Sequence, residues 1–130
     1  MNGVAYYNDS KGTNVDAAIK GIQAMTRKTI LIGGGYDKQS DYDEWIRSFD
    51  GKVKYLILLG QTAEKIAVCA KKNGFLNVIF VKDLKEAVDV AKAKAEKGDA
   101  VLLSPACASW GMFKNYEERG CMFKSFVNRL

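Results

Sequence analysis

The chain has 130 residues, 48% hydrophobic and 27% charged, a composition that suits one globular domain with its own core and excludes a disordered chain. Its net charge of +5 is spread out and forms no basic block interleaved with aromatic residues, so small anionic molecules are expected partners in preference to nucleic acid. The three cysteines lack paired close spacing and the chain has no histidine, so neither a disulfide framework nor a zinc site is expected.

Membrane insertion and export are not expected. The longest strongly apolar runs, at 55–60 and 100–103, fall far short of the roughly 20 residues that span a bilayer. The first nine residues contain neither a basic leader nor an apolar signal core, which predicts a cytoplasmic protein.

Short apolar runs alternate with amphipathic segments along the whole chain. Runs rich in β-branched, aromatic or leucine residues predict strands at 3–8, 28–34, 53–60, 77–81 and 99–104. Between them, apolar residues spaced three and four apart predict helices at about 15–22, 42–49, 63–70 and 84–95, with a last helix at about 115–129. Asp83 and Glu86 have capping-box spacing at the start of the fourth helix, while Gly74 and Gly98 mark the expected ends of the third and fourth.

This order of elements predicts the fold class. Five alternations of strand and helix are typical of an α/β protein, here a three-layer α/β/α, Rossmann-like domain with a mainly parallel sheet of five or six strands. The sequence has no internal repeat and no interdomain linker, so residues 1–130 are expected to form a single domain. Ligands of such sheets bind beyond the carboxyl ends of the strands, which directs attention to the loops that follow the strands.

Three of these loops are rich in polar residues: 8–14, 33–40 and 104–115. In a parallel sheet they open on one edge, and their convergence favours a functional site. The last loop combines Ser104, Ser109 and Asn115 with small residues that let an anion approach backbone N–H groups. A turn of small residues between strand and helix is also a common structural feature, so the loop alone leaves both interpretations open.

Lysines in the first two loops favour anion binding. Thr13 or Asn14 can cap the helix that begins near Val15, which accounts for those two residues without a ligand. Lys11 adds charge to an already positive helix end, which costs stability unless an anion binds there. Lys38 follows three glycines that offer free N–H groups, although such a run also makes an ordinary flexible turn.

Motifs of several catalytic classes are absent from the sequence. There is no GxxxxGK[ST] motif, so the chain cannot make the phosphate cradle of a P-loop by itself. Without histidine the usual general base is missing, and Cys107, which has no identifiable base, is interpreted as a small packing residue. The residues alone therefore predict an anion-binding sheet edge and no identifiable catalytic set.

Three segments carry a family resemblance: YNDSKGTN at 7–14, GGGYDK at 33–38, and LLSPACAS with FKNYEERG at 102–120. In this order and spacing they resemble the C-terminal domain of the Mur ligases, over essentially the whole chain. The resemblance is strongest to members that add D-glutamate to UDP-N-acetylmuramoyl-L-alanine in peptidoglycan synthesis. It implies a multidomain ATP-dependent ligase whose central ATPase domain and N-terminal UDP-binding domain are absent from this chain.

The resemblance also implies a mechanism. In the family, ATP phosphorylates the UDP-muramoyl-alanine carboxylate, the amine of D-glutamate attacks the acyl phosphate, and the C-terminal domain closes over the site. ATP and Mg²⁺ would act in the full-length enzyme. The isolated domain is expected to be an inactive monomer that holds no cofactor tightly, ligates no metal and binds no membrane.

The resemblance assigns roles to individual residues. Lys38 and Thr13 would hold the α-carboxylate of D-glutamate, and Ser109 with the backbone at Tyr116 would hold its side-chain carboxylate, since lysine supplies charge and hydroxyl or N–H groups supply direction. The segment Trp110-Gly111-Met112 departs from the Leu-Asp-Gln usual in the family. This departure leaves the amino-acid substrate open.

The remaining assignments concern the nucleotide. Asn8 and Asp9 would face it, and Lys11 would act as the catalytic residue by offsetting charge that develops on the transferring phosphoryl group. The competing interpretation is a stand-alone α/β module that binds an anionic metabolite or a protein partner. A P-loop motif encoded in frame upstream of Met1 would favour the ligase, and a native start at Met1 would favour the module.

Overall fold

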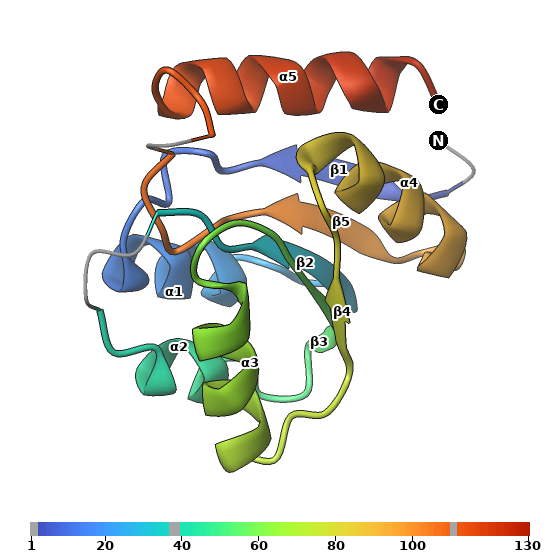
Figure 1. Ribbon diagram of the computed structural model, residues 1–130. Coiled ribbons are helices and arrows are strands. Elements are labelled where there is room, and N and C mark those ends of the chain that lie inside the picture. Colours follow the sequence, from blue (N-terminus) through green and yellow to red (C-terminus); the bar gives the residue numbers. More distant parts are fainter. Residues whose placement is uncertain (1–2, 37–39, 110–111) are drawn as a thin grey trace.

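The computed structural model describes residues 3–36, 40–109 and 112–130 and contains strictly alternating strands and helices (Figure 1). The elements are β1 Ala5–Asn8, α1 Val15–Gln23, β2 Thr29–Gly33, α2 Asp43–Arg47, β3 Val53–Leu58, α3 Ala63–Lys72, β4 Val78–Phe80, α4 Leu84–Lys94, β5 Ala100–Leu103 and α5 Tyr116–Asn128. Each predicted strand and helix is confirmed, although each strand is two residues shorter than its predicted range and α2 is three residues shorter. No helix in the described ranges has both the length and the apolar character to cross a bilayer.

All neighbouring strands of the sheet are parallel, in the order β1-β5-β2-β3-β4. Because β5 returns between β1 and β2, the last loop of the sheet emerges between the first two. Figure 1 shows α1, α2 and α3 on one face of the sheet and α5 along the other, where α4 also packs. The three-layer α/β/α prediction is therefore confirmed.

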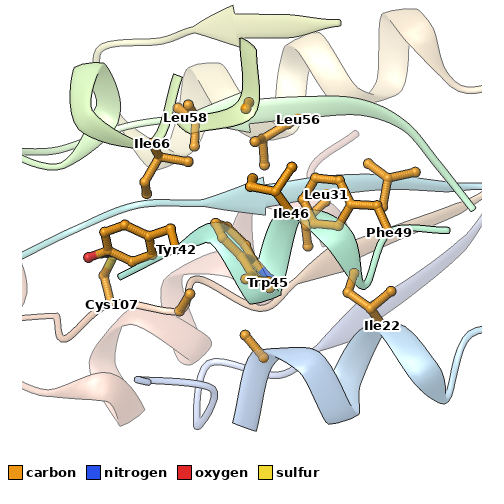
Figure 2. Close-up of a cluster of buried hydrophobic side chains, with 14 of the residues drawn as sticks. Ile22, Leu31, Tyr42, Trp45, Ile46, Phe49, Leu56, Leu58, Ile66 and Cys107 are labelled. Carbon is orange, nitrogen blue, oxygen red and sulfur yellow. Dashed lines mark hydrogen bonds between the residues drawn. The ribbon is translucent and has the colours of Figure 1, made fainter. Parts of the chain in front are cut away.

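The central strands are buried on both faces, which explains their nearly continuous hydrophobicity. Along β2, Leu31 packs toward α1, α2 and α3, while its neighbours Ile30 and Ile32 pack toward α4 and α5. Figure 2 shows the first of these clusters, with Trp45 of α2 at its centre. A Cβ on Gly33 would lie 2.7 Å from Cη2 of Trp45, so the end of β2 needs glycine to accommodate the indole ring.

Helix ends follow the predicted polar residues, with two differences. Asn14 caps α1 by accepting the Ala17 N–H at 2.8 Å, and Gly74, at φ +82°, follows the end of α3. The predicted end of α4 at Gly98 is wrong: the helix stops at Lys94 because Ala95 is already extended, and Gly98 forms the turn into β5.

The predicted capping box of α4 forms only in part. Asp83 accepts the Glu86 N–H at 2.8 Å, as the motif requires. The Glu86 carboxylate accepts the N–H of Lys82 at 3.0 Å, however, one residue before the expected partner. The α5 start repeats this arrangement, with Asn115 as the cap and Glu118 bonded to the N–H of Lys114.

A partly buried ion pair between Lys54 and Asp99 joins β3 to the turn before β5 at the amino end of the sheet. Asp99 is 6% exposed, and its Oδ2 accepts from Lys54 Nζ at 2.7 Å and from the Glu96 N–H at 2.8 Å. Burial alone would raise the pKa of Asp99, but these hydrogen bonds outweigh it and the pKa is lowered. The ion pair therefore stabilises the folded state above the unfolded pKa of aspartate, about 3.9, and loses its effect as the pH falls.

Asp99→Asn is expected to lower the free energy of unfolding at pH 7 by about 1 kcal/mol, since it removes a charge-assisted hydrogen bond. The difference from wild type should begin to shrink below about pH 3.9 and disappear as the pH falls through the lowered pKa of the folded Asp99, because protonation then removes the wild-type ion pair. Urea denaturation of wild type and variant at pH 7 and in acid measures the two differences in the free energy of unfolding. Asp89→Asn, which removes an exposed pair with Lys85, is the matched control. An equal loss in both variants, or one that persists at low pH, would contradict the account.

Candidate functional site

The loops after β1, β2 and β5 meet at the carboxyl edge of the sheet, as predicted. The first and last are joined where the Asp9 N–H donates to the Leu103 carbonyl at 2.7 Å and the Ala106 N–H donates to the Gly12 carbonyl at 2.8 Å. The second and last are joined by the Gly34 N–H and the Pro105 carbonyl at 3.0 Å. The loop that follows β5 therefore forms the middle of the site.

Asp9 connects two of these loops through its side chain. Its Oδ2 accepts a hydrogen bond from the Ser104 hydroxyl at 2.7 Å. The carboxylate lies against α1, because a Cβ on Gly21 would come within 2.8 Å of the same oxygen. Asp9 thus has a partner within the domain that the sequence analysis did not identify, and this contact fixes the start of the first loop.

A pocket of about 350 Å³ opens between the first loop and the start of α5. It brings together four predicted site residues, Asn8, Asp9, Lys11 and Tyr116. The rest of its lining is Ser10, Glu117, Gly120, Cys121 and Lys124. An amide, an exposed lysine and the first turn of a helix thus face one space, and these are groups that bind anions.

The other predicted site residues lie elsewhere. Thr13 is half-buried between Lys11, whose carbonyl accepts its N–H at 2.7 Å, and the cap of α1. Ser109 is 4% exposed, and its carbonyl accepts the N–H groups of Met112 and Phe113. Lys38 lies outside the described residues, as do Trp110 and Gly111 of the departing segment.

Arg119 is a buried cation that the sequence analysis missed. It is 2% exposed, and its guanidinium donates to the Ser10 hydroxyl at 2.9 Å, the Ser10 carbonyl at 2.8 Å and the Cys107 carbonyl at 3.1 Å. Burial lowers the pKa of Arg119 to about 10, an effect that the electrostatic influence of Cys107 opposes, and the group stays charged at neutral pH. One side chain of α5 thereby holds the first and last loops together.

A signal for Arg119 was present in the sequence. The apolar residues Tyr116, Phe123 and Phe126 mark one face of the last helix, and Arg119 falls on this face, three residues after Tyr116 and four before Phe123. A charged residue at a buried position of an amphipathic helix needs polar partners, and here loop carbonyls and a hydroxyl supply them.

Gly120 explains why α5 can approach the first loop so closely. A Cβ at this position would lie 3.0 Å from Nδ2 of Asn8 and 3.2 Å from Cβ of Ser10. Because glycine has no Cβ, the Asn8 amide can donate to the Gly120 carbonyl at 3.2 Å, and the Ser10 hydroxyl can donate to the Tyr116 carbonyl at 2.6 Å. The glycine costs helix stability of about 1 kcal/mol and allows this contact.

Comparison with known proteins shows to which family the chain belongs. The family model described as "Mur ligase, glutamate ligase domain" matches residues 1–107. The chain belongs to this family. It is 64% identical over 128 residues to the UDP-N-acetylmuramoylalanine–D-glutamate ligase of Lachnoclostridium phytofermentans, and 59% identical over 129 residues to that of Lachnospira eligens. These matches cover 98% and 99% of this chain but 28% and 29% of the relatives, so the chain spans less than a third of their length.

Solved structures share the fold at low sequence identity. A domain of a Haemophilus ducreyi protein described as a UDP-N-acetylmuramate:L-alanyl-gamma-D-glutamyl-diaminopimelate ligase matches with a TM-score of 0.59 and 15% identity, covering 97% of this chain and 94% of that one. Mycobacterium tuberculosis folylpolyglutamate synthase, crystallised with ADP and AMPPCP, matches with a TM-score of 0.61 and 13% identity over 88% of this chain and 28% of its own. Both confirm the fold class.

Arg119→Met is expected to lower the free energy of unfolding by about 2–4 kcal/mol, because it leaves buried carbonyls of two loops without their donor. Urea denaturation at pH 7 measures the loss. Arg119→Lys should recover part of it, since an ammonium reaches fewer of the three acceptors. Arg27→Met, at an exposed arginine, serves as the control and should change stability by no more than about 0.5 kcal/mol. Equal effects at the two positions would show that the buried contacts do not matter.

Proposed function

We propose that this chain is the C-terminal domain of an ATP-dependent ligase that adds D-glutamate to UDP-N-acetylmuramoyl-L-alanine in peptidoglycan synthesis. The observation that carries the proposal is 64% identity, over 98% of the chain, to a ligase of that name. The convergence of three polar loops at the carboxyl edge of the sheet supports it, because this is where α/β sheets bind ligands. The central ATPase domain and the N-terminal UDP-binding domain would lie in other parts of the full-length protein.

The start of α5 is suited to a carboxylate. Tyr116 is its first helical residue, and N–H groups in the first turn have no partner within the helix. The cap, Asn115, accepts the N–H of Glu118, and Tyr116 is among the residues that line the pocket. In the proposed enzyme the backbone at Tyr116 and the Ser109 hydroxyl hold the side-chain carboxylate of D-glutamate, while Lys38 and Thr13 hold its α-carboxylate.

The nucleotide would meet the first loop. The Asn8 side chain is fixed by bonds to the Ser10 N–H and the Gly120 carbonyl, and Lys11 is exposed beside it in the same pocket. A fixed amide and an exposed ammonium fit a polyanionic ligand, so these residues and Asp9 are compatible with ATP. Bound ATP and Mg²⁺ would supply phosphoryl transfer, and Lys11 would stabilise negative charge during that transfer.

Substitution of Lys38 and of Lys11 in the full-length ligase should have different kinetic effects. Lys38→Ala should chiefly raise the KM for D-glutamate, by about 10- to 150-fold, because a charged hydrogen bond to a carboxylate contributes about 1.5–3 kcal/mol. Lys11→Ala should lower kcat with little change in that KM, since its interaction strengthens in the transition state. Steady-state kinetics with each substrate varied in turn decides this. An unchanged KM in Lys38→Ala, or the two phenotypes exchanged, would contradict the assignments.

The 130-residue chain alone should neither hydrolyse ATP nor form an amide bond, because it has no GxxxxGK[ST] motif to hold the phosphates. Phosphate release with ATP, Mg²⁺, UDP-muramoyl-alanine and D-glutamate should match the buffer blank. Addition of the full-length ligase to the same mixture provides the positive control. Turnover by the chain itself would show that it is a catalytic unit of another kind.

A further inference from the structure

Three buried polar side chains meet behind the loop that carries Ser109. The Sγ atom of Cys107 lies 3.4 Å from the hydroxyl oxygen of Tyr42 and 3.4 Å from Oγ1 of Thr62. All three residues are at most 2% exposed. Figure 2 shows the Tyr42 ring extending from the chain before α2 toward Cys107. Each of the three comes from a different connection between elements, so together they join parts of the chain that are remote in sequence.

Thr62 makes a second contact with the loop after β2, at Gly35. Its Oγ1 accepts the Gly35 N–H at 3.0 Å, and its own N–H donates to the Gly35 carbonyl at 3.2 Å. Gly35 has a φ of +148°, and a Cβ there would lie 2.6 Å from the Ala108 carbonyl oxygen, so the two loops are in close contact. The side chain of Thr62 therefore touches both loops that flank the proposed D-glutamate site.

The segment between β2 and α2 is attached to the last loop on both sides of Lys38. Before it in the sequence, the Tyr36 N–H donates to the Ala108 carbonyl at 2.9 Å. After it, the Tyr42 hydroxyl contacts Cys107. Both attachments fall on the two residues that immediately precede Ser109.

We propose that Tyr42 and Thr62 are positioning residues for D-glutamate, whose hydroxyl contacts with Cys107 set the placement of the Ser109 loop relative to the segment that contains Lys38. This inference rests on the proposed function, which assigns Lys38 and Ser109 to the two carboxylates of one substrate. A ligand held at both ends is sensitive to the distance between its binding groups, so a displaced Ser109 loop should weaken the binding of D-glutamate.

The contacts explain why hydroxyls are present in an otherwise apolar region. The Tyr42 ring packs against Trp45 with centroids 6.2 Å apart, a contact that phenylalanine would keep. Burying a hydroxyl costs free energy unless it has a partner, so a polar group here serves a geometric purpose beyond filling space. Because a contact to sulfur is a weak hydrogen bond, its removal should affect substrate binding more than global stability.

Tyr42→Phe in the full-length ligase is expected to raise the KM for D-glutamate by about 5-fold or more, with kcat and the KM for ATP nearly unchanged. Thr62→Val should act in the same direction. Tyr55→Phe, on the opposite face of the sheet, is the matched control and should leave all three constants unaltered. An unchanged D-glutamate KM in Tyr42→Phe would overturn the inference, and so would an equal effect of Tyr55→Phe.

A double-mutant comparison shows whether Tyr42 acts through the sulfur. Cys107→Ala alone should raise the D-glutamate KM, and adding Tyr42→Phe should raise it little further, since both remove the same contact. Multiplicative effects of the two changes would contradict a shared contact.

Hydrogen exchange of the ligand-free, full-length protein tests the contact separately from the activity. In Tyr42→Phe the amides of Tyr36 and of residues 106–109 should exchange faster than in wild type, while those of β5 should not change. Unchanged exchange in the loop would overturn the positioning role whatever the substrate. If exchange is faster in Tyr42→Phe but the activity of the wild-type enzyme does not depend on D-glutamate, the contact is confirmed and the proposed function is wrong.

Discussion

The buried charge of Arg119 is the constraint on which the arrangement of the site depends. A guanidinium at 2% exposure is tolerated only where oxygen atoms surround it, and here they come from Ser10 in the first loop and Cys107 in the last. The charge cannot be removed at neutral pH, so the loops must stay around it. The same helix turn presents Gly120 and Tyr116 to the first loop, so the fixing of Arg119 also defines the pocket.

The order of the strands makes this arrangement possible. Because β5 lies between β1 and β2, its loop can be bonded on one side to the loop of β1 and on the other to the loop of β2. Thr62, at the start of α3, extends the contacts to the connection after β3. The loop from Ser104 to Ser109 is consequently buried almost throughout, although it contains no regular secondary structure. Burial and hydrogen bonds on both sides restrict the conformations open to such a loop, which suits the proposed role of presenting binding groups with fixed spacing.

Much of the fold could be predicted from the sequence, because local patterns and global packing agree. The continuous apolar runs form strands that are buried on both faces. Asn14 and Asp83 cap the starts of helices, and Gly74 follows the end of one, as their chemistry predicts. The end of α4 was misplaced because Gly98 serves a tight turn into β5. Asp99, next to Gly98, pairs with Lys54, a residue remote in the sequence.

The site was less predictable, since its polar contacts join residues far apart in the chain. Asp9 and Ser104 stood out as polar residues, yet nothing in their spacing indicated that they bond to each other. Arg119 was hidden within a helix pattern that was read for its apolar members alone. Cys107 was correctly placed in the interior, but its contacts with Tyr42 and Thr62 follow from topology and could not be read from spacing.

The central claim is that the carboxyl edge of this sheet holds D-glutamate and faces the nucleotide. A crystal structure of the full-length ligase with ADP and the D-glutamyl product tests it most directly. The account predicts that the two glutamyl carboxylates lie beside Ser109 with the start of α5 and beside Lys38 with Thr13, with the nucleotide next to Asn8 and Lys11. A glutamyl group bound away from these loops, for example at the amino end of the sheet near Lys28, would contradict it.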